Sequence, residues 1–188
     1  MRTVDQLIAE DVPEALRRFI RESCALAPDA FRPLAPAAMP QPEQRLLVHA
    51  HDMTTTLTEF HDSPLHVEVL QRQQTDELYL REVFLRSATE KVVEYGVIAI
   101  ALDRFTPGQQ ETILAGRIPL GGLLHQFRIP FVSAPLGFFS VAAEELDDCA
   151  LSAESGATCY GRFNRLARPT GEALAWILEI LPPAARPA

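Results

Sequence analysis

A charged residue on the apolar face of a predicted strand is the feature that most constrains this sequence. The segment DELYLREVFLR, residues 76–86, alternates in the way typical of a β-strand. One face of that strand carries Tyr79, Arg81, Val83 and Leu85. A guanidinium keeps its proton, and burying it unpaired costs roughly several kcal/mol. We therefore expect Arg81 to meet an anionic group, which either the protein or a ligand supplies.

The last predicted strand contains the opposite charge in a similar place. In EALAWILEIL, residues 172–181, both faces are apolar, as in a strand covered on each side, and Glu179 interrupts one of them. One interpretation is a structural ion pair between Arg81 and Glu179. The other is a cavity beside the sheet, with Arg81 held for an anionic ligand and Glu179 placed for proton transfer or hydrogen bonding. Alternation alone leaves both interpretations open.

The rest of the chain predicts an α+β fold, with about six antiparallel strands and helices packed on the sheet. A short N-terminal helix, about 4–24, and a connector rich in Pro and Ala, 27–44, precede the main body. We therefore divide the chain into residues 1–42 and a main unit of residues 43–188, together one globular domain.

Within the main unit, spacing predicts three kinds of segment. Helical spacing is found at 42–61 and 107–116, residues 118–127 are expected to form a second short helix or a turn, and β-like segments lie at 64–73, 77–86 and 91–102. A hairpin with arms at 158–168 and 172–181 closes the chain. The stretch 131–157 is expected to be a loop with one helical turn.

Charge and composition exclude several classes of protein. The net charge is −8, Lys91 is the only lysine and no basic cluster is present, which argues against a nucleic-acid surface. No apolar run is long enough for a membrane helix, and the acidic N-terminus does not resemble a signal peptide, so we expect a cytoplasmic protein. The three cysteines, Cys24, Cys149 and Cys159, are too scattered for a disulfide framework or a zinc site, so we expect them to be reduced.

The histidine pair in HAHD, residues 49–52, does not predict a metal site. On a continuous helix His49 and His51 would lie about 200° apart and could not share an ion. We therefore expect no metal.

Four segments in chain order resemble the chorismate–pyruvate lyase (4-hydroxybenzoate synthetase) family. They are HDMTTTLTEFHDSPLHVEVL, YLREVFL, GRIPLGGLL, and YGRFNRL with LAWILEILPP. The resemblance covers residues 43–184. It implies a six-stranded antiparallel sheet with helices that enclose the active site, a fold shared with the ligand-binding domains of some bacterial transcription regulators.

The resemblance also implies an activity and a set of site residues. The reaction would convert chorismate to 4-hydroxybenzoate and pyruvate, as in aromatic-acid biosynthesis, without a metal or organic cofactor. Arg81 would clamp a substrate carboxylate and Glu179 would assist proton transfer, while Met53 and Leu120 would line the bound ring. The alternative is a non-catalytic module on the same fold that binds an aromatic acid. Either reading predicts a small-molecule partner and no nucleic-acid or membrane partner, in a monomer or weak homo-oligomer.

Two features depart from the family pattern. The third strand reads Tyr95-Gly96, where bacterial lyases carry a Gly-Arg or another charged pair, and residues 126–158 form a longer segment than in compact lyases. Arg162 and Arg165 are candidates for a second carboxylate contact, with an exposed position on the hairpin as the alternative.

Overall fold

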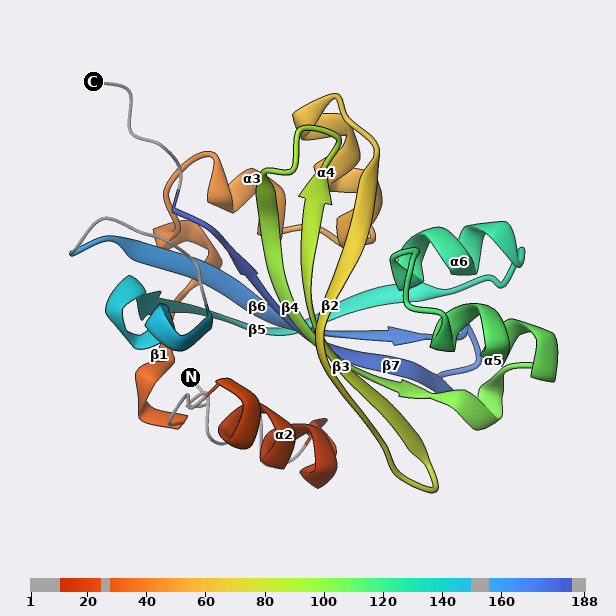
Figure 1. Ribbon diagram of the computed structural model, residues 1–188. Helices are drawn as coiled ribbons and strands as arrows, with labels where there is room; N and C mark the ends of the chain where they lie inside the picture. Colours follow the sequence, from red (N-terminus) through yellow and green to blue (C-terminus); the bar gives the residue numbers. More distant parts are fainter. Residues whose placement is uncertain (1–10, 25–27, 150–155, 184–188) are drawn as a thin grey trace.

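One twisted antiparallel sheet organises the chain (Figure 1). The computed structural model describes residues 11–24, 28–149 and 156–183. Within these ranges the sheet has seven strands in the order β1-β5-β6-β7-β4-β3-β2. The strands are β1 Arg32–Pro33, β2 Leu65–Gln74, β3 Leu78–Ser87, β4 Val92–Ala101, β5 Val132–Ala142, β6 Thr158–Ala167 and β7 Ala173–Leu181.

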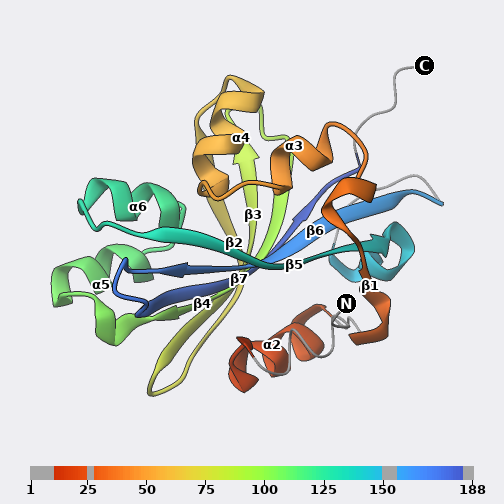
Figure 2. The same ribbon diagram turned by 180° about the vertical axis from the view of Figure 1, so that it is seen from behind.

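Helices cover both faces of the sheet. The α-helices are α2 Glu14–Cys24, α3 Glu43–Leu47, α4 Met53–His61, α5 Pro107–Leu114 and α6 Leu120–Gln126. Short 3₁₀ turns are η1 Pro28–Ala30, η2 Pro36–Ala38, η3 Leu102–Arg104 and η4 Ala143–Cys149. Helix α2 lies on the opposite side of the sheet from α3 and α4, whereas α5 and α6 lie together near one end of β4 and β7 (Figures 1 and 2). In the described part of the chain, no helix has the length and apolar character needed to cross a membrane.

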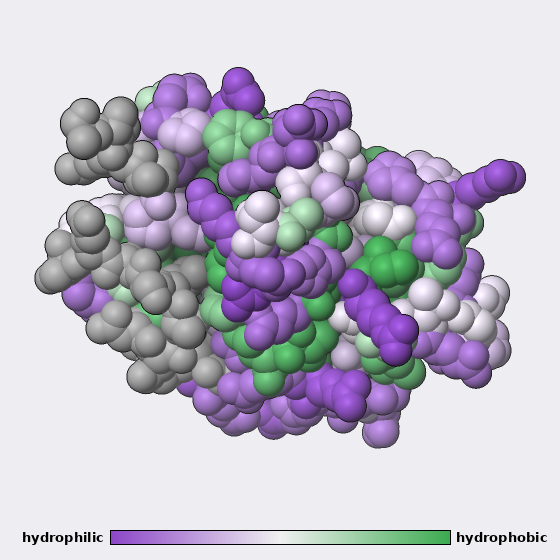
Figure 3. All heavy atoms as spheres, turned by 45° about the horizontal axis from the view of Figure 1, so that its top comes forward, coloured by the Kyte–Doolittle hydropathy of each residue, from purple (hydrophilic) through white to green (hydrophobic). Residues whose placement is uncertain are grey.

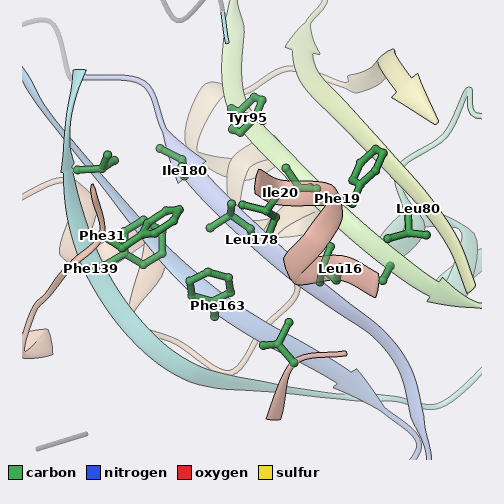
Figure 4. Close-up of a cluster of buried hydrophobic side chains, with 14 of the residues drawn as sticks. Leu16, Phe19, Ile20, Phe31, Leu80, Tyr95, Phe139, Phe163, Leu178 and Ile180 are labelled. Carbon is green, nitrogen blue, oxygen red and sulfur yellow. The ribbon is translucent and has the colours of Figure 1, made fainter. Parts of the chain in front are cut away.

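The larger apolar core lies between α2 and the sheet. Leu16, Phe19 and Ile20 of α2 point toward sheet residues such as Leu80 and Leu178 (Figure 4). All five side chains are buried. The alternation predicted for β3 is confirmed, because Leu80 faces this core and its neighbour Tyr79 belongs to a different cluster.

The other sheet face carries two separate apolar clusters. One includes Tyr79, Ile98 and Leu120, and packs with α5 and α6. The second includes Met53 and Val83, and packs with α3 and α4. The functional site described below occupies the space between them.

The α+β antiparallel fold is confirmed. Of the stretch 131–157, the expected helical turn is present as η4, residues 150–155 lie outside the described residues, and the expectation of a loop is wrong for the first part. Residues Val132–Ala142 form β5, which pairs with β6 along its length. Pro135 and Gly137 hid this strand from the sequence pattern, and the register shifts between them, as expected where a bulge accommodates proline. The two-residue β1, which pairs with the far edge of β5, lies in the connector and was also missed.

The helix predicted over 42–61 is in fact two helices, α3 and α4. Residues 48–52 separate the two helices, and Asp52 is the N-cap of α4. Its side chain accepts a hydrogen bond from the Thr55 backbone nitrogen, 2.9 Å away. The hairpin of β6 and β7 is confirmed, as are the two helices α5 and α6. Of the helix predicted at about 4–24, residues 1–10 lie outside the described residues.

Gly161 of β6 provides a test of this packing. A Cβ atom there would lie 2.5 Å from the Glu179 backbone oxygen and 2.5 Å from the Phe139 ring. We expect Gly161→Ala to lower the free energy of unfolding by about 3 kcal/mol or more, measured by urea denaturation. Gly108→Ala is the matched control, since nothing lies within 4 Å of a Cβ at that position, and its stability should be unchanged or slightly higher. Equal stability of the two variants would contradict the close strand packing.

Candidate functional site

A pocket lies between the sheet and the first residues of α4 and α6. All four residues that the sequence analysis nominated line it: Met53 from α4, Leu120 from α6, Arg81 from β3 and Glu179 from β7. Its volume is about 50 Å³. For comparison, an apolar cavity of about 150 Å³ holds benzene. A ligand with a ring therefore requires the pocket to widen.

Polar side chains predominate on the surface at this side of the molecule (Figure 3). A view tilted to bring the top of Figure 1 forward shows a mainly hydrophilic surface, with apolar side chains visible in smaller areas between polar ones (Figure 3). The pocket thus has apolar lining with a few polar groups, the composition typical of small-molecule sites.

Arg81 is buried without a counter-charge. Its side chain is 2% exposed, and neither its Nε nor its Nη1 atom has a hydrogen-bond partner among the described residues. Burial lowers the pKa of Arg81, although an arginine still keeps its proton in a protein. Tyr79, two residues earlier on the same strand, also has a buried hydroxyl without a partner. The predicted burial of Arg81 is confirmed, and no carboxylate among the described residues forms an ion pair with it.

Glu179 is paired, but with Arg162 rather than with Arg81. The two residues stand opposite each other on β6 and β7, and Arg162 Nε donates a hydrogen bond to Glu179 Oε2. Arg162 Nη1 also donates to the backbone oxygens of Leu47, at 2.9 Å, and His49, at 3.1 Å. Arg162 therefore ties the segment between α3 and α4 to the sheet.

This geometry corrects two interpretations made from the sequence. The ion pair imagined between Arg81 and Glu179 is not formed, because Arg162 takes that place. Arg162 is also not an exposed hairpin residue, since its side chain is 0% exposed. The predicted hairpin already made the two arms neighbours, but alternation does not give the register that places Arg162 opposite Glu179.

Glu94 of β4 is a further buried acid at the pocket, and it was not among the residues predicted from the sequence. Glu94 is 4% exposed and lines the pocket, and its Oε2 atom has no hydrogen-bond partner in the described part of the chain. A signal was present in KVVEYGVIAIAL, where the same alternation places Glu94 on one face with Gly96 and Ile98. Burial and the nearby Glu179 carboxylate raise the pKa of Glu94 well above its ordinary value, while Arg162 opposes them.

The Tyr95-Gly96 departure has a structural explanation. Gly96 lies between Val83 and Glu179 in the sheet, and a Cβ there would stand 3.3 Å from Val83 Cγ2 and 3.4 Å from Glu94 Oε1. The missing side chain at Gly96 therefore leaves room for the pocket. Tyr95 points to the opposite face, where its hydroxyl donates to Glu82 Oε1 at 2.8 Å.

Polar contacts hold α4 and α6 together at the mouth of the pocket. Asp52 Oδ2 lies 3.1 Å from His125 Nε2, and a Cβ at Gly121 would stand only 2.7 Å from Asp52 Oδ1. Burial by itself would raise the pKa of Asp52, but hydrogen bonds from Thr55 and His125 outweigh it and lower the pKa. These contacts must rearrange if the pocket widens by separation of the two helices.

The described residues include no group of three or more His, Cys, Asp and Glu side chains suited to a metal ion. His49 and His51 lie in the segment between α3 and α4, with their rings stacked 5.9 Å apart between centroids. The Cys159 thiol is free and buried, and burial raises its pKa to about 12. Cys159 is thus a core residue with no sign of reactivity.

Comparisons with known proteins show similarity at the level of the fold. No family model and no curated protein matches the chain. PhnF from Mycobacterium smegmatis is similar with a TM-score of 0.55 and 13% identity, over 92% of this chain and 80% of PhnF. The effector domain of the same protein is similar with a TM-score of 0.53 and 12% identity, over 82% of this chain and 93% of that domain. Gene product SA0254 from Staphylococcus aureus is similar with a TM-score of 0.50 and 10% identity, over 72% of this chain and 90% of SA0254. The chain therefore shares the fold of a bacterial effector domain.

The two buried arginines should respond oppositely to removal of their charge. Arg162→Met leaves Glu179 buried without its counter-charge, and we expect unfolding free energy to fall by about 3–5 kcal/mol. Arg81→Met removes a buried cation that has no partner, so stability should be unchanged or higher. Urea denaturation of both variants at neutral pH measures the difference. Equal destabilisation by the two substitutions would show that Arg81 has a structural counter-charge.

Proposed function

We propose that this domain is a non-catalytic binding module for a small organic acid, whose carboxylate pairs with Arg81. The observation that carries the proposal is the buried Arg81 guanidinium, which faces a pocket without an anionic partner among the described residues. A carboxylate matches the planar fork of arginine, in which Nη2 acts together with either Nε or Nη1, and it would give a partner to one of the two free nitrogens. The ligand would thus complete an interaction that the protein leaves open.

Two further observations support binding over catalysis. The shared fold includes the effector domain of PhnF, so the architecture serves as an effector domain in at least that protein. In addition, Glu179 Oε2 is already occupied by Arg162, which leaves this carboxylate less available for proton transfer.

Chorismate lyase activity is our second proposal. Its support is the gathering of Met53, Arg81, Leu120 and Glu179, the four residues implied by the resemblance, around one pocket. Chorismate carries two carboxylates, however, and Arg162 does not line the pocket as a second clamp. Incubation with chorismate followed by chromatography for pyruvate and hydroxybenzoate tests this proposal. Release of both products, lost in Arg81→Met, would favour the enzyme.

The binding proposal is tested by calorimetry with 4-hydroxybenzoate. We expect the wild type to bind and Arg81→Lys to bind on the order of 10- to 100-fold more weakly, because an ammonium cannot reproduce the two parallel hydrogen bonds. Arg72→Lys is the matched control. Arg72 stands opposite Arg81 in the register of β2 and β3, but its side chain is exposed. Equal affinity in the Arg81→Lys variant and the wild type would contradict the role of Arg81.

A further inference from the structure

Glu94 and Arg81 approach the pocket from opposite ends. Arg81 stands opposite Ile98 of β4. Glu94 precedes Ile98 by four residues on that strand, with Gly96 between them. At about 3.3 Å per residue the two positions are separated by roughly 13 Å along the strand. Both side chains nevertheless line the same pocket, so a ligand held by Arg81 extends toward Glu94.

The charged groups around Glu94 come from four elements. Glu179 on β7 and Arg162 on β6 are its closest electrostatic neighbours, with Arg81 on β3 at the far end of the pocket. Asp52 at the start of α4 also lines the pocket and is itself engaged by His125. Burial and the Glu179 carboxylate raise the pKa of Glu94, and Arg162 offsets this only in part because it also pairs with Glu179.

The count of charges follows from the protonation of Glu94. With a neutral Glu94, the three charged groups that stand on the other strands, Arg81, Arg162 and Glu179, carry one net positive charge, while Asp52 lies at the start of α4 and is engaged by His125. A ligand with a single carboxylate would neutralise this positive charge. An ionised Glu94 would balance the arginines without any ligand. A protonated carboxyl also supplies one O–H donor. Glu94 Oε2, which is buried and has no partner among the described residues, is available to carry it.

We propose that Glu94 donates a hydrogen bond to the bound ligand and thereby selects monocarboxylates with an acceptor group at the end away from Arg81. This inference rests on the proposed binding of a carboxylate by Arg81. A hydroxyl or carbonyl oxygen at that end accepts the hydrogen bond, whereas a plain apolar end leaves the buried donor unpaired. A second carboxylate at that end meets Glu179 and is disfavoured by like charge.

The protonation of Glu94 is measured first without any ligand. In protein labelled with ¹³C at the glutamate side-chain carboxyls, the signal missing from Glu94→Gln belongs to Glu94. We expect this signal to titrate at a clearly higher pH than a glutamate in water, for which the pKa is about 4.3. Titration of Glu94 together with the exposed glutamates would overturn the proposal.

The dependence of stability on pH gives an independent reading. Because the folded pKa of Glu94 is raised, its favourable contribution is complete below the ordinary value of 4.5 and is lost as pH rises toward the folded pKa. The stability of the wild type should therefore fall relative to Glu94→Gln over that interval. Parallel stability curves for the two proteins would contradict a raised pKa.

Selectivity is measured by calorimetry with 4-hydroxybenzoate, benzoate and terephthalate. We expect the wild type to prefer 4-hydroxybenzoate to benzoate on the order of tenfold, and to bind terephthalate more weakly than either. Glu94→Gln retains an N–H donor and should keep the preference for the hydroxyl. Glu94→Met lacks a donor and should lose that preference with little change in benzoate affinity.

The outcomes separate this inference from the proposed function. If the acids bind and the preference survives in Glu94→Met, the donor role of Glu94 is wrong while carboxylate binding stands. If none of the three acids binds to the wild type, carboxylate binding at Arg81 is wrong, and the donor role fails with it.

Discussion

The buried guanidinium of Arg81 is the constraint on which the pocket depends. A fold that buries an arginine without a counter-charge accepts a free-energy cost that apolar packing must offset. Here the offset comes from the opposite sheet face, where α2 seals a continuous apolar core. The free-energy cost of burying Arg81 is therefore offset by apolar packing on the other face of the same sheet. Binding of an anion would recover part of it, which couples occupancy of the pocket to stability.

The charged residues also explain why the core on that face is divided. Arg81, Glu94 and Glu179 stand on neighbouring strands between the cluster packed under α5 and α6 and the cluster packed under α3 and α4. Leu120 belongs to the first cluster and Met53 to the second, so the pocket bridges the two. Relative movement of α4 and α6 could thus change the volume of the pocket without disturbing the core beneath α2.

The sequence predicted the parts of the fold that depend on local periodicity. Alternation placed Arg81 and Glu179 in buried strands, and the hairpin of β6 and β7 was recognisable. Strand β5 escaped because proline and glycine interrupt its pattern. The hairpin made β6 and β7 neighbours, but the partner of Glu179 depends on their exact register, which shifts between Leu166 and Ala167. Glu94 was within reach, since it breaks an apolar face in the same way as Arg81 does.

The pairing of Glu179 with Arg162 bears most directly on the choice between binding and catalysis. Arg162 Nη1 spans to the backbone of Leu47 and His49, so moving Arg162 to free Glu179 would also disturb the segment that leads into α4. Proton transfer by Glu179 would need that rearrangement in every turnover, whereas anion binding by Arg81 needs none of it. Glu94, whose pKa is raised by burial and by Glu179, has an Oε2 atom with no partner among the described residues, and this atom is available to a ligand. The arrangement therefore favours recognition of a ligand over its chemical conversion.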